Sequence, residues 1–129
     1  MNKQTVHMLD ALRGAGISAD DALALRRISM TLHRWHELEC GTGTGHVERD
    51  ETTGRTYWCS ARIDSRSPTP DRETGALKRL AAIMARYPDL TAYVQGDPRG
   101  ASLYILRPGD VPEGQDVEGY YSRGLPVYA

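Results

Sequence analysis

The chain has 129 residues, a common size for one domain, so a second independent core is not expected. Apolar residues make up 40% and charged residues 26% of the sequence, which excludes the composition of a disordered chain. The 16 basic and 17 acidic residues give a formal net charge of -1, so the overall charge does not favour nucleic acid or acidic membranes as partners. We therefore expect residues 1–129 to form a single domain.

Two helices are expected in the first third of the chain. Apolar residues recur at helical spacing over residues 3–13, and the glycine-containing segment 14–16 follows as a stop. A longer helix is expected over residues 19–39, because its apolar residues recur at spacings of three and four. These apolar positions are Leu25, Ile28, Leu32 and Trp35. The run of glycines at residues 41–45 ends this helix.

Two β-hairpins and a third helix are expected in the middle of the chain. The first hairpin joins residues 46–50 to residues 55–63, which contain several aromatic and β-branched side chains. Residues 71–87 carry apolar side chains at helical spacing and are followed by a proline, which predicts an amphipathic helix. The second hairpin joins residues 90–95 to residues 101–107 through a glycine-rich turn.

The end of the chain is rich in glycine and proline. We expect residues 108–129 to form an irregular tail packed on the domain, with a short strand at residues 125–128. The order helix, helix, hairpin, helix, hairpin does not alternate strands and helices as parallel α/β units do. The predicted fold class is therefore α+β, with an antiparallel sheet built from two hairpins and packed against two longer helices and one short N-terminal helix.

The cysteine content and the apolar segments indicate a cellular compartment. The two cysteines, Cys40 and Cys59, are too few for the disulfide framework of a small secreted protein. The N-terminus lacks the apolar region of a signal peptide, and no stretch approaches the roughly 18 apolar residues that span a bilayer. We expect a cytoplasmic protein with no membrane association.

One group of residues has the chemistry of a metal site. His33, His36 and Cys40 fall on one flank of the predicted long helix, and His46 or Cys59 could complete a tetrahedral zinc site. Their spacing matches no established zinc signature. The alternative interpretation is that the histidines are solvated and that Cys40 is a small residue near the helix end. No cofactor is expected unless these residues bind zinc.

Arginines and an aromatic residue are the candidates for partner binding. Arg34 lies on the long helix, Arg55 and Trp58 lie in the first hairpin, and Arg99 lies at the tip of the second. Arg99 belongs to the segment GDPRG at residues 96–100, where glycines allow close approach and an arginine can grip phosphate or carboxylate. The alternative for this segment is a turn that simply needs proline and glycine.

Two further interpretations concern the type of partner. Tyr57 and Trp58 lie between arginines, a mixture that a single-strand DNA or RNA binding face would use, although the balanced net charge argues against it. Tyr120, Tyr121 and Arg123 in the tail have the composition of a protein contact. No pair of residues is set apart as a nucleophile and base or as an acid and base, so the sequence does not favour an enzyme.

Three stretches of the chain carry a resemblance. They are ALRRISMTLHRW at residues 24–35, RLAAIM at residues 79–84, and YVQGDPRG at residues 93–100 together with LRPGD at residues 106–110. In these stretches the chain resembles small uncharacterised proteins carried by bacterial prophages and other mobile elements, and the resemblance covers most of the chain. It implies a phage or mobile-element origin in a proteobacterial host, and it transfers no activity to any residue.

The resemblance implies a function in general terms. Small accessory proteins of such elements bind host machinery, so we expect a non-enzymatic protein that engages a host protein or a protein–nucleic acid complex, including as an inhibitor of a defence system of the anti-CRISPR type. A small zinc-binding protein, with or without catalytic activity, is the first alternative. A module that binds DNA or RNA directly is the second.

Overall fold

The computed structural model describes residues 1–35, 44–61, 63–66, 72–97 and 100–128 of the chain. Within them the helices are α1 (Lys3–Gly14), α2 (Ala19–Trp35) and α3 (Arg72–Met84), with one 3-10 turn, η1 (Tyr121–Arg123). The strands are β1 (Gly45–Arg49), β2 (Thr56–Cys59), β3 (Thr91–Asp97), β4 (Gly100–Leu106) and β5 (Leu125–Val127).

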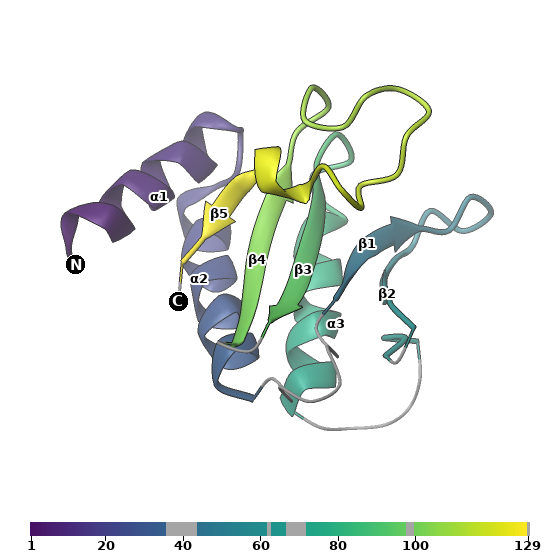
Figure 1. Cartoon of the computed structure of the whole chain (residues 1–129), viewed down its shortest axis with the longest axis horizontal. Coiled ribbons are helices and arrows are strands. Elements are labelled where there is room, and N and C mark those ends of the chain that lie inside the picture. The colour runs from purple at the N-terminus through teal and green to yellow at the C-terminus, as the bar shows by residue number, and fades with distance from the viewer. Residues whose placement is uncertain (36–43, 62, 67–71, 98–99, 129) are drawn as a thin grey trace.

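The five strands form one sheet in the order β2-β1-β3-β4-β5. Every neighbouring pair is antiparallel, so the predicted α+β fold with an antiparallel sheet, two longer helices and a short N-terminal helix is confirmed. Figure 1 shows α2 and α3 side by side behind the sheet and α1 beside β5. No described helix covers the other face of the sheet, which is turned toward the viewer.

Local sequence signals set the beginnings of the first two helices. Asn2 caps α1, because its Oδ1 accepts a hydrogen bond of 2.8 Å from the N–H of Thr5. Ser18 caps α2 in the same way, since its Oγ accepts a hydrogen bond of 3.2 Å from the N–H of Asp21. Between the two helices Gly16 adopts a φ of 97°, which favours glycine.

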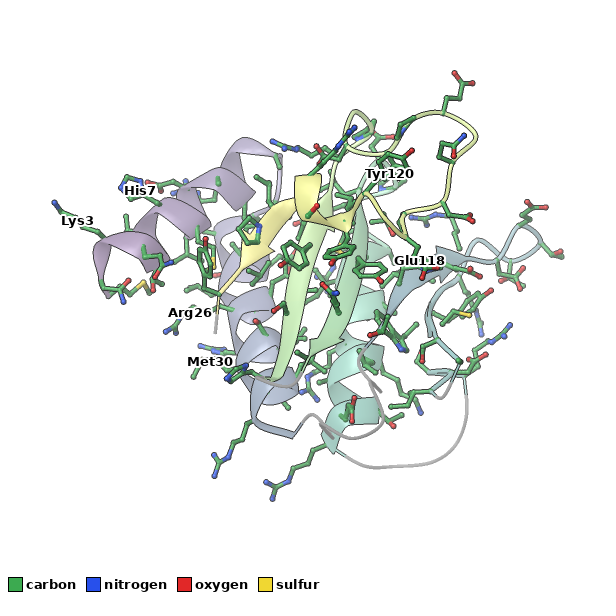
Figure 2. The ribbon with its side chains drawn as sticks, viewed as in Figure 1. Lys3, His7, Arg26, Met30, Glu118 and Tyr120 are labelled. Carbon is green, nitrogen blue, oxygen red and sulfur yellow. The ribbon has the colours of Figure 1, made fainter. Side chains whose placement is uncertain are left out.

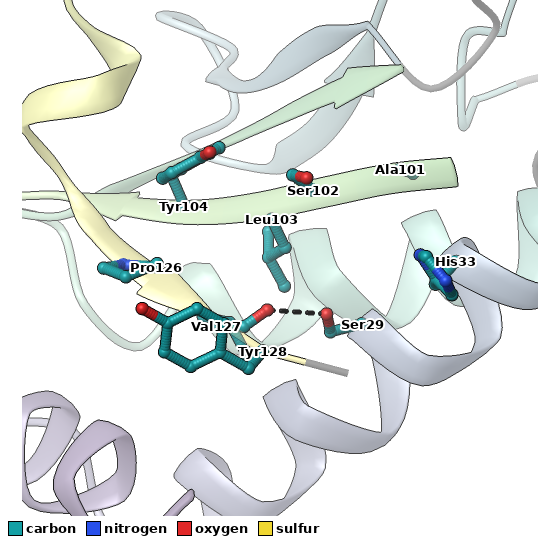
Figure 3. A pocket seen from close by; sticks show the side chains of 9 residues that line it. All are labelled: Ser29, His33, Ala101, Ser102, Leu103, Tyr104, Pro126, Val127 and Tyr128. Carbon is teal, nitrogen blue, oxygen red and sulfur yellow. Dashed lines mark hydrogen bonds between the residues drawn. The ribbon is translucent and has the colours of Figure 1, made fainter. Parts of the chain in front are cut away.

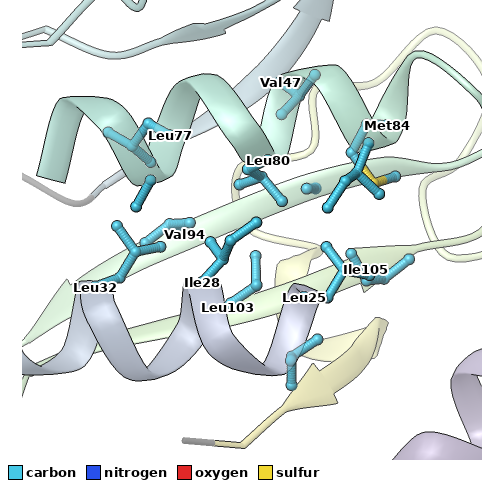
Figure 4. Close-up of a cluster of buried hydrophobic side chains, with 14 of the residues drawn as sticks. Leu25, Ile28, Leu32, Val47, Leu77, Leu80, Met84, Val94, Leu103 and Ile105 are labelled. Carbon is cyan, nitrogen blue, oxygen red and sulfur yellow. The ribbon is translucent and has the colours of Figure 1, made fainter. Parts of the chain in front are cut away.

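The core lies between the sheet and the helix pair. Leu25, Ile28 and Leu32 of α2 meet the apolar residues of α3 and the buried face of the central strands (Figure 4). Labelled members of this cluster are Leu25, Ile28, Leu32, Val47, Leu77, Leu80, Met84, Val94, Leu103 and Ile105. Most of these side chains are no more than 2% exposed, so burial of apolar surface holds the two layers together.

The first hairpin differs from its prediction in the length of its second strand. β2 ends at Cys59 rather than at residue 63, because the side chain of Ser60 accepts a hydrogen bond of 3.0 Å from the N–H of Ile63 and turns the chain. The chain then folds back along β2, where the N–H of Ser65 donates to the carbonyl of Trp58 at 3.1 Å. The N–H of Trp58 in turn donates to Oγ of Ser65 at 2.6 Å. This return segment covers the outer edge of β2.

The end of the chain adds a strand that completes the sheet. β5 pairs with the second half of β4, in the register Leu103↔Val127, Tyr104↔Pro126 and Ile105↔Leu125. This pairing confirms the short strand that was predicted at residues 125–128. Turns and the 3-10 turn η1 occupy residues 107–124. Within the described part of the chain, no helix is long and apolar enough to cross a membrane.

Candidate functional site on the open face of the sheet

One row of side chains crosses all five strands on the face that no described helix covers. Residues paired across strands point to the same face, and neighbours along a strand point to opposite faces. The row consists of Cys59, His46, Tyr93, Tyr104 and Pro126, each paired with the next. Neighbours along the strands belong to the core, namely Val47, Trp58, Val94, Leu103 and Val127. We call this surface the open face; it also carries Glu48, Tyr57, Gln95 and Ser102.

A carboxylate organises the β1–β2 end of the open face. Oε1 of Glu48 lies 2.9 Å from Nε2 of His46, and Oε2 accepts a hydrogen bond of 2.8 Å from the hydroxyl of Tyr57. The bond from Tyr57, followed by the contact with His46, lowers the pKa of Glu48, so this side chain stays ionised. The same bond raises the pKa of Tyr57, which keeps its hydroxyl protonated and donating.

An arginine lies over the tyrosine at this end of the face. The guanidinium carbon of Arg66 lies 4.0 Å from the ring centroid of Tyr57, within the range of a cation–π contact. Asp64 holds Arg66 in place, with an ion pair of 2.6 Å between Oδ2 and the guanidinium. The residues that fold back along β2 therefore also build part of the open face.

Three tyrosines form the centre of the open face. The ring of Tyr121, from η1, stacks on Tyr93 with centroids 4.7 Å apart and planes inclined by 13°. Tyr104 meets the same ring edge-on, with centroids 5.4 Å apart. Tyr93 is buried, whereas Tyr104 and Tyr121 are half-buried. Figure 2 shows Tyr120 and Glu118 on the tail that borders this cluster.

The electrostatics of the open face do not activate its thiol. Cys59 is a free cysteine directly opposite His46. Burial raises the pKa of the Cys59 thiol, and the negative charges of Glu48 and Asp64 raise it further. A nucleophilic or metal-binding cysteine needs the opposite shift, toward the thiolate. The Cys59 side chain in this setting is a neutral thiol.

The partner-binding residues predicted from the sequence are spread over the molecule. Arg34 is exposed near the end of α2, and Arg55 is exposed at the turn between β1 and β2. Arg99 lies outside the described residues. The prediction for Trp58 is wrong: its side chain is 0% exposed and packs in the core, because Tyr57 takes the outward position of that strand. A Cβ at Gly45 would lie 2.8 Å from ring carbon Cζ2 of Trp58, so the indole fills the space beneath that glycine.

The predicted metal ligands do not assemble in the described residues. His33 lies on α2, on the helix side of the sheet, and Cys59 lies on the open face, so the two cannot bind one ion. His36 and Cys40 lie outside the described residues. Where the structure describes the chain, no group of three or more histidine, cysteine, aspartate or glutamate side chains is arranged to hold a metal ion.

His33 instead packs against the start of β4. Gly100 adopts a φ of 134°, and a Cβ there would collide with the imidazole of His33. This favours the interpretation of the glycine-rich segment as a turn that needs glycine. Next to this contact, a cavity of about 210 Å³ lies between α2, the first half of β4 and the end of β5 (Figure 3).

Sequence reasoning missed most of the open face. Tyr93, Tyr104 and Glu48 were not singled out, because nothing in the local sequence tells which face of a strand is covered by helices. The alternation of residues 101–106 carries a signal for Tyr104, since apolar residues flank it at the buried positions. Tyr121 was noted as a candidate protein contact, and it lies at the centre of the face.

Comparisons with known proteins provide no family for this chain. No protein-family model matches it, no curated protein is significantly similar to it, and no solved structure matches its fold. The open face therefore has to be interpreted from its own chemistry.

Proposed function

We propose that this chain is a non-enzymatic binding protein that engages a host protein or a protein–nucleic acid complex through the open face. The observation that carries the proposal is the row of aromatic and polar side chains that crosses all five strands on the face that no described α-helix covers. Tyr93 in this row is buried beneath Tyr121, and the other members are half-buried. A solvated sheet face normally carries plain polar residues. Tyrosine and arginine in this arrangement are the residue types that dominate protein interfaces.

The state of the titratable groups supports binding rather than catalysis. A general acid at neutral pH needs a raised carboxyl pKa, and a cysteine nucleophile needs a lowered thiol pKa. On the open face the pKa of Glu48 is lowered and the pKa of Cys59 is raised. These shifts leave an ionised carboxylate and a neutral thiol, which suit hydrogen bonding and packing against a partner.

The charges on the open face favour a protein partner over DNA or RNA alone. Glu48 and Asp64 lie among the aromatic residues, and Arg66 is already paired with Asp64. Burial raises the pKa of Tyr93, and the negative charge of Glu118 raises it further. These carboxylates would repel the phosphates of a nucleic acid, whereas a protein partner can pair them with its own basic side chains.

The origin and setting of the protein form part of the same proposal. The resemblance to prophage and mobile-element proteins supports an accessory protein that acts in the bacterial cytoplasm. Its specific form is inhibition of a host defence system of the anti-CRISPR type, in which a small protein occupies a surface of a larger complex. Such inhibition requires a stable interface and no reaction.

Affinity capture from a proteobacterial host lysate tests the proposal. The wild-type protein is compared with the double variant Tyr57→Ala and Tyr104→Ala, which removes two rings from the open face. A matched control carries Lys78→Ala and Arg79→Ala on exposed positions of α3. We expect quantitative mass spectrometry to show a partner that the wild type and the control retain and the open-face variant loses by at least tenfold.

Two results would redirect the proposal. Equal capture by the open-face variant, shown to be folded by its melting curve, would exclude this surface. Loss of capture instead in Arg34→Glu and Arg55→Glu would assign binding to the exposed arginines. A nuclease treatment of the lysate separates protein from nucleic acid: a partner that disappears with nuclease would indicate that DNA or RNA is contacted directly.

A further inference from the structure

Two buried residues of the sheet lie outside the main core. Tyr93 is 3% exposed and Leu106 is 1% exposed, yet neither belongs to the apolar cluster between the sheet and the helices. Both are covered by the segment that joins β4 to β5. The ring of Tyr121 stacks on Tyr93, and Gly124 lies so close to Leu106 that a Cβ there would be 3.1 Å from its Cγ. This segment supplies the cover that no described α-helix gives to the open face.

Residues 111–123 of this segment, which we call the strap, lie on the sheet without hydrogen bonds to it. The described backbone hydrogen bonds of the strap join residues three apart, namely Gln115 to Pro112, Tyr120 to Val117, and Arg123 to Tyr120. Among the described residues, no hydrogen bond joins the strap to a strand. The strap is fixed at its two ends, by the ion pair of Arg107 with Asp110 and by the close approach of Gly124 to β4. Between these ends the ring of Tyr121 is its contact with the open face.

The ring of Tyr121 is held by ring contacts alone. In the part of the chain that the structure describes, the hydroxyls of Tyr93, Tyr104 and Tyr121 have no hydrogen-bond partner. The hydroxyls of Tyr57 and Tyr87, in contrast, each donate to a carboxylate. Rotation of the Tyr121 side chain therefore breaks no hydrogen bond of that side chain, and the ring can leave Tyr93 while both ends of the strap stay fixed.

The two rings beneath Tyr121 are positioned by the sheet. Tyr93 and Tyr104 are cross-strand partners on β3 and β4, and we call this pair the aromatic cradle. Tyr121 lies flat on Tyr93, with planes inclined by 13°, and meets Tyr104 at 61°. Stacked and edge-on arrangements are those in which aromatic rings attract each other. The cradle therefore fits one aromatic ring, and Tyr121 shows which chemistry it accepts.

The cradle occupies the centre of the proposed interface. Its two tyrosines lie in the middle of the row that crosses the sheet, with His46 on one side and Pro126 on the other. Tyr121 is half-buried, so a partner that lies along the open face meets this ring. Central aromatic residues carry much of the binding energy of protein interfaces and tend to pair with such residues of the partner.

We propose that the aromatic cradle is a binding subsite for an aromatic side chain of the partner protein, which replaces the ring of Tyr121. This inference rests on the proposed function and adds which group the partner inserts. In the free protein Tyr121 competes for the cradle from within the same chain, which lowers the apparent affinity for the partner. Removal of the Tyr121 ring therefore strengthens binding, whereas removal of a ring that contacts the partner directly weakens it.

The first test uses p-cresol, which is the side chain of tyrosine as a free molecule. It is titrated into Tyr121→Ala, and binding is followed by nuclear magnetic resonance of the Tyr93 and Tyr104 rings. We expect saturable binding at least tenfold tighter than to the wild type, whose cradle is filled. Tyr120→Ala is the matched control, because its ring lies by Arg123, with 5.2 Å between the guanidinium carbon and the ring centroid. This variant should bind p-cresol as the wild type does.

Two results of the titration would overturn the proposal. One is the absence of saturable binding to Tyr121→Ala that is shown to be folded by its melting curve. The other is tighter binding of methylguanidine than of p-cresol, which would assign the cradle to an arginine of the partner. If Tyr121→Ala does not fold, the wild type decides: the nuclear Overhauser effect between the rings of Tyr121 and Tyr93 should weaken as p-cresol is added. An unchanged effect would overturn the proposal.

Lysate capture separates this inference from the proposed function. We expect folded Tyr121→Ala to retain at least threefold more partner than the wild type, and Tyr120→Ala to show no gain. Equal or lower capture by Tyr121→Ala, with the expected loss in the double variant Tyr57→Ala and Tyr104→Ala, would overturn the inference and keep the open face as the interface. Unchanged capture by the double variant would overturn the proposed function and this inference with it.

Discussion

The two faces of the sheet are built from the same strands and have different physical roles. On the helix side, Trp58, Val94 and Ile105 are completely buried. On the open face, Glu48 and Tyr57 are tied by a hydrogen bond of 2.8 Å, and Tyr104 meets another ring edge-on. Since the faces alternate residue by residue, one set of side chains forms the core, and the other forms the surface to which we assign partner binding in our proposal. Stability and recognition can therefore change independently.

The largest expected effect comes from neighbouring residues on opposite faces of β4. Leu103→Ala should lower the free energy of unfolding by about 2–5 kcal/mol, because it removes buried methyl groups and leaves a void. Ser102→Ala, one residue away on the open face, should change it by less than about 0.5 kcal/mol. Urea unfolding measures both values. Similar losses in the two variants would contradict the division between the faces.

The next effect concerns the residues that fold back along β2. Ser65 is 8% exposed, and its Oγ accepts a hydrogen bond of 2.6 Å from the N–H of Trp58. Ser65→Ala leaves that buried N–H without an acceptor, so we expect a loss of about 1–3 kcal/mol in urea unfolding. The exposed Ser122→Ala serves as the control and should be neutral. A neutral Ser65→Ala would show that this segment does not hold the edge strand.

A smaller, pH-dependent effect is expected in the helix layer. The hydroxyl of Tyr87 donates to Asp21 at 2.5 Å, and Arg86 forms an ion pair with the same carboxylate at 2.7 Å. The bond from Tyr87 is the main cause of the lowered pKa of Asp21. The unfolded chain therefore binds a proton at a higher pH than the folded chain, and the stabilisation is present at neutral pH and is lost as the pH falls through the lowered pKa.

The variant Asp21→Asn tests this contribution. It should cost about 1 kcal/mol at neutral pH and show a flatter loss of stability in acid than the wild type, measured by urea unfolding across the acid range. The exposed Asp20→Asn should retain the acid sensitivity of the wild type. Parallel curves for Asp21→Asn and the wild type would show that this carboxylate does not link α2 to the end of α3.

The smallest change is expected on the open face and is spectroscopic. Glu48 raises the pKa of Tyr57 by accepting a hydrogen bond from its hydroxyl, so Glu48→Gln should return that pKa toward its ordinary value. Titration of the phenolate absorbance measures the shift, with Tyr57→Phe to identify the signal. The melting temperature should change little, because the pair is partly exposed. An unchanged titration would exclude this hydrogen bond in solution.

Local patterns were enough to predict the elements. The spacing of Leu25, Ile28 and Leu32 identified α2, and all three residues are buried in the core. Ser18 directly precedes the predicted start of this helix and is a residue type that favours helix caps, and its side chain forms the cap. The strand predicted at 55–63 was too long, because the side chain of Ser60 turns the chain at a position where a strand-like composition continues.

The candidate site depended much more on tertiary structure. Trp58 was assigned to a partner surface, yet the pairing with β1 turns it toward the helices and turns Tyr57 outward. His33 and Cys59 were grouped by chemistry, and the sheet separates them. Contacts between residues far apart in the chain, such as the ring of Tyr121 on Tyr93, cannot be read from spacing.

The sequence by itself determined the fold class, the helices, the hairpins and the near-zero net charge. These follow from periodicity, capping residues and composition, which act over a few residues or over the whole chain. Only the tertiary structure decided which strand face is covered, which residues of β4 pair with β5, and that Tyr121 stacks on Tyr93. These properties arise from the register of distant segments, because a shift of one residue would exchange the two faces of a strand.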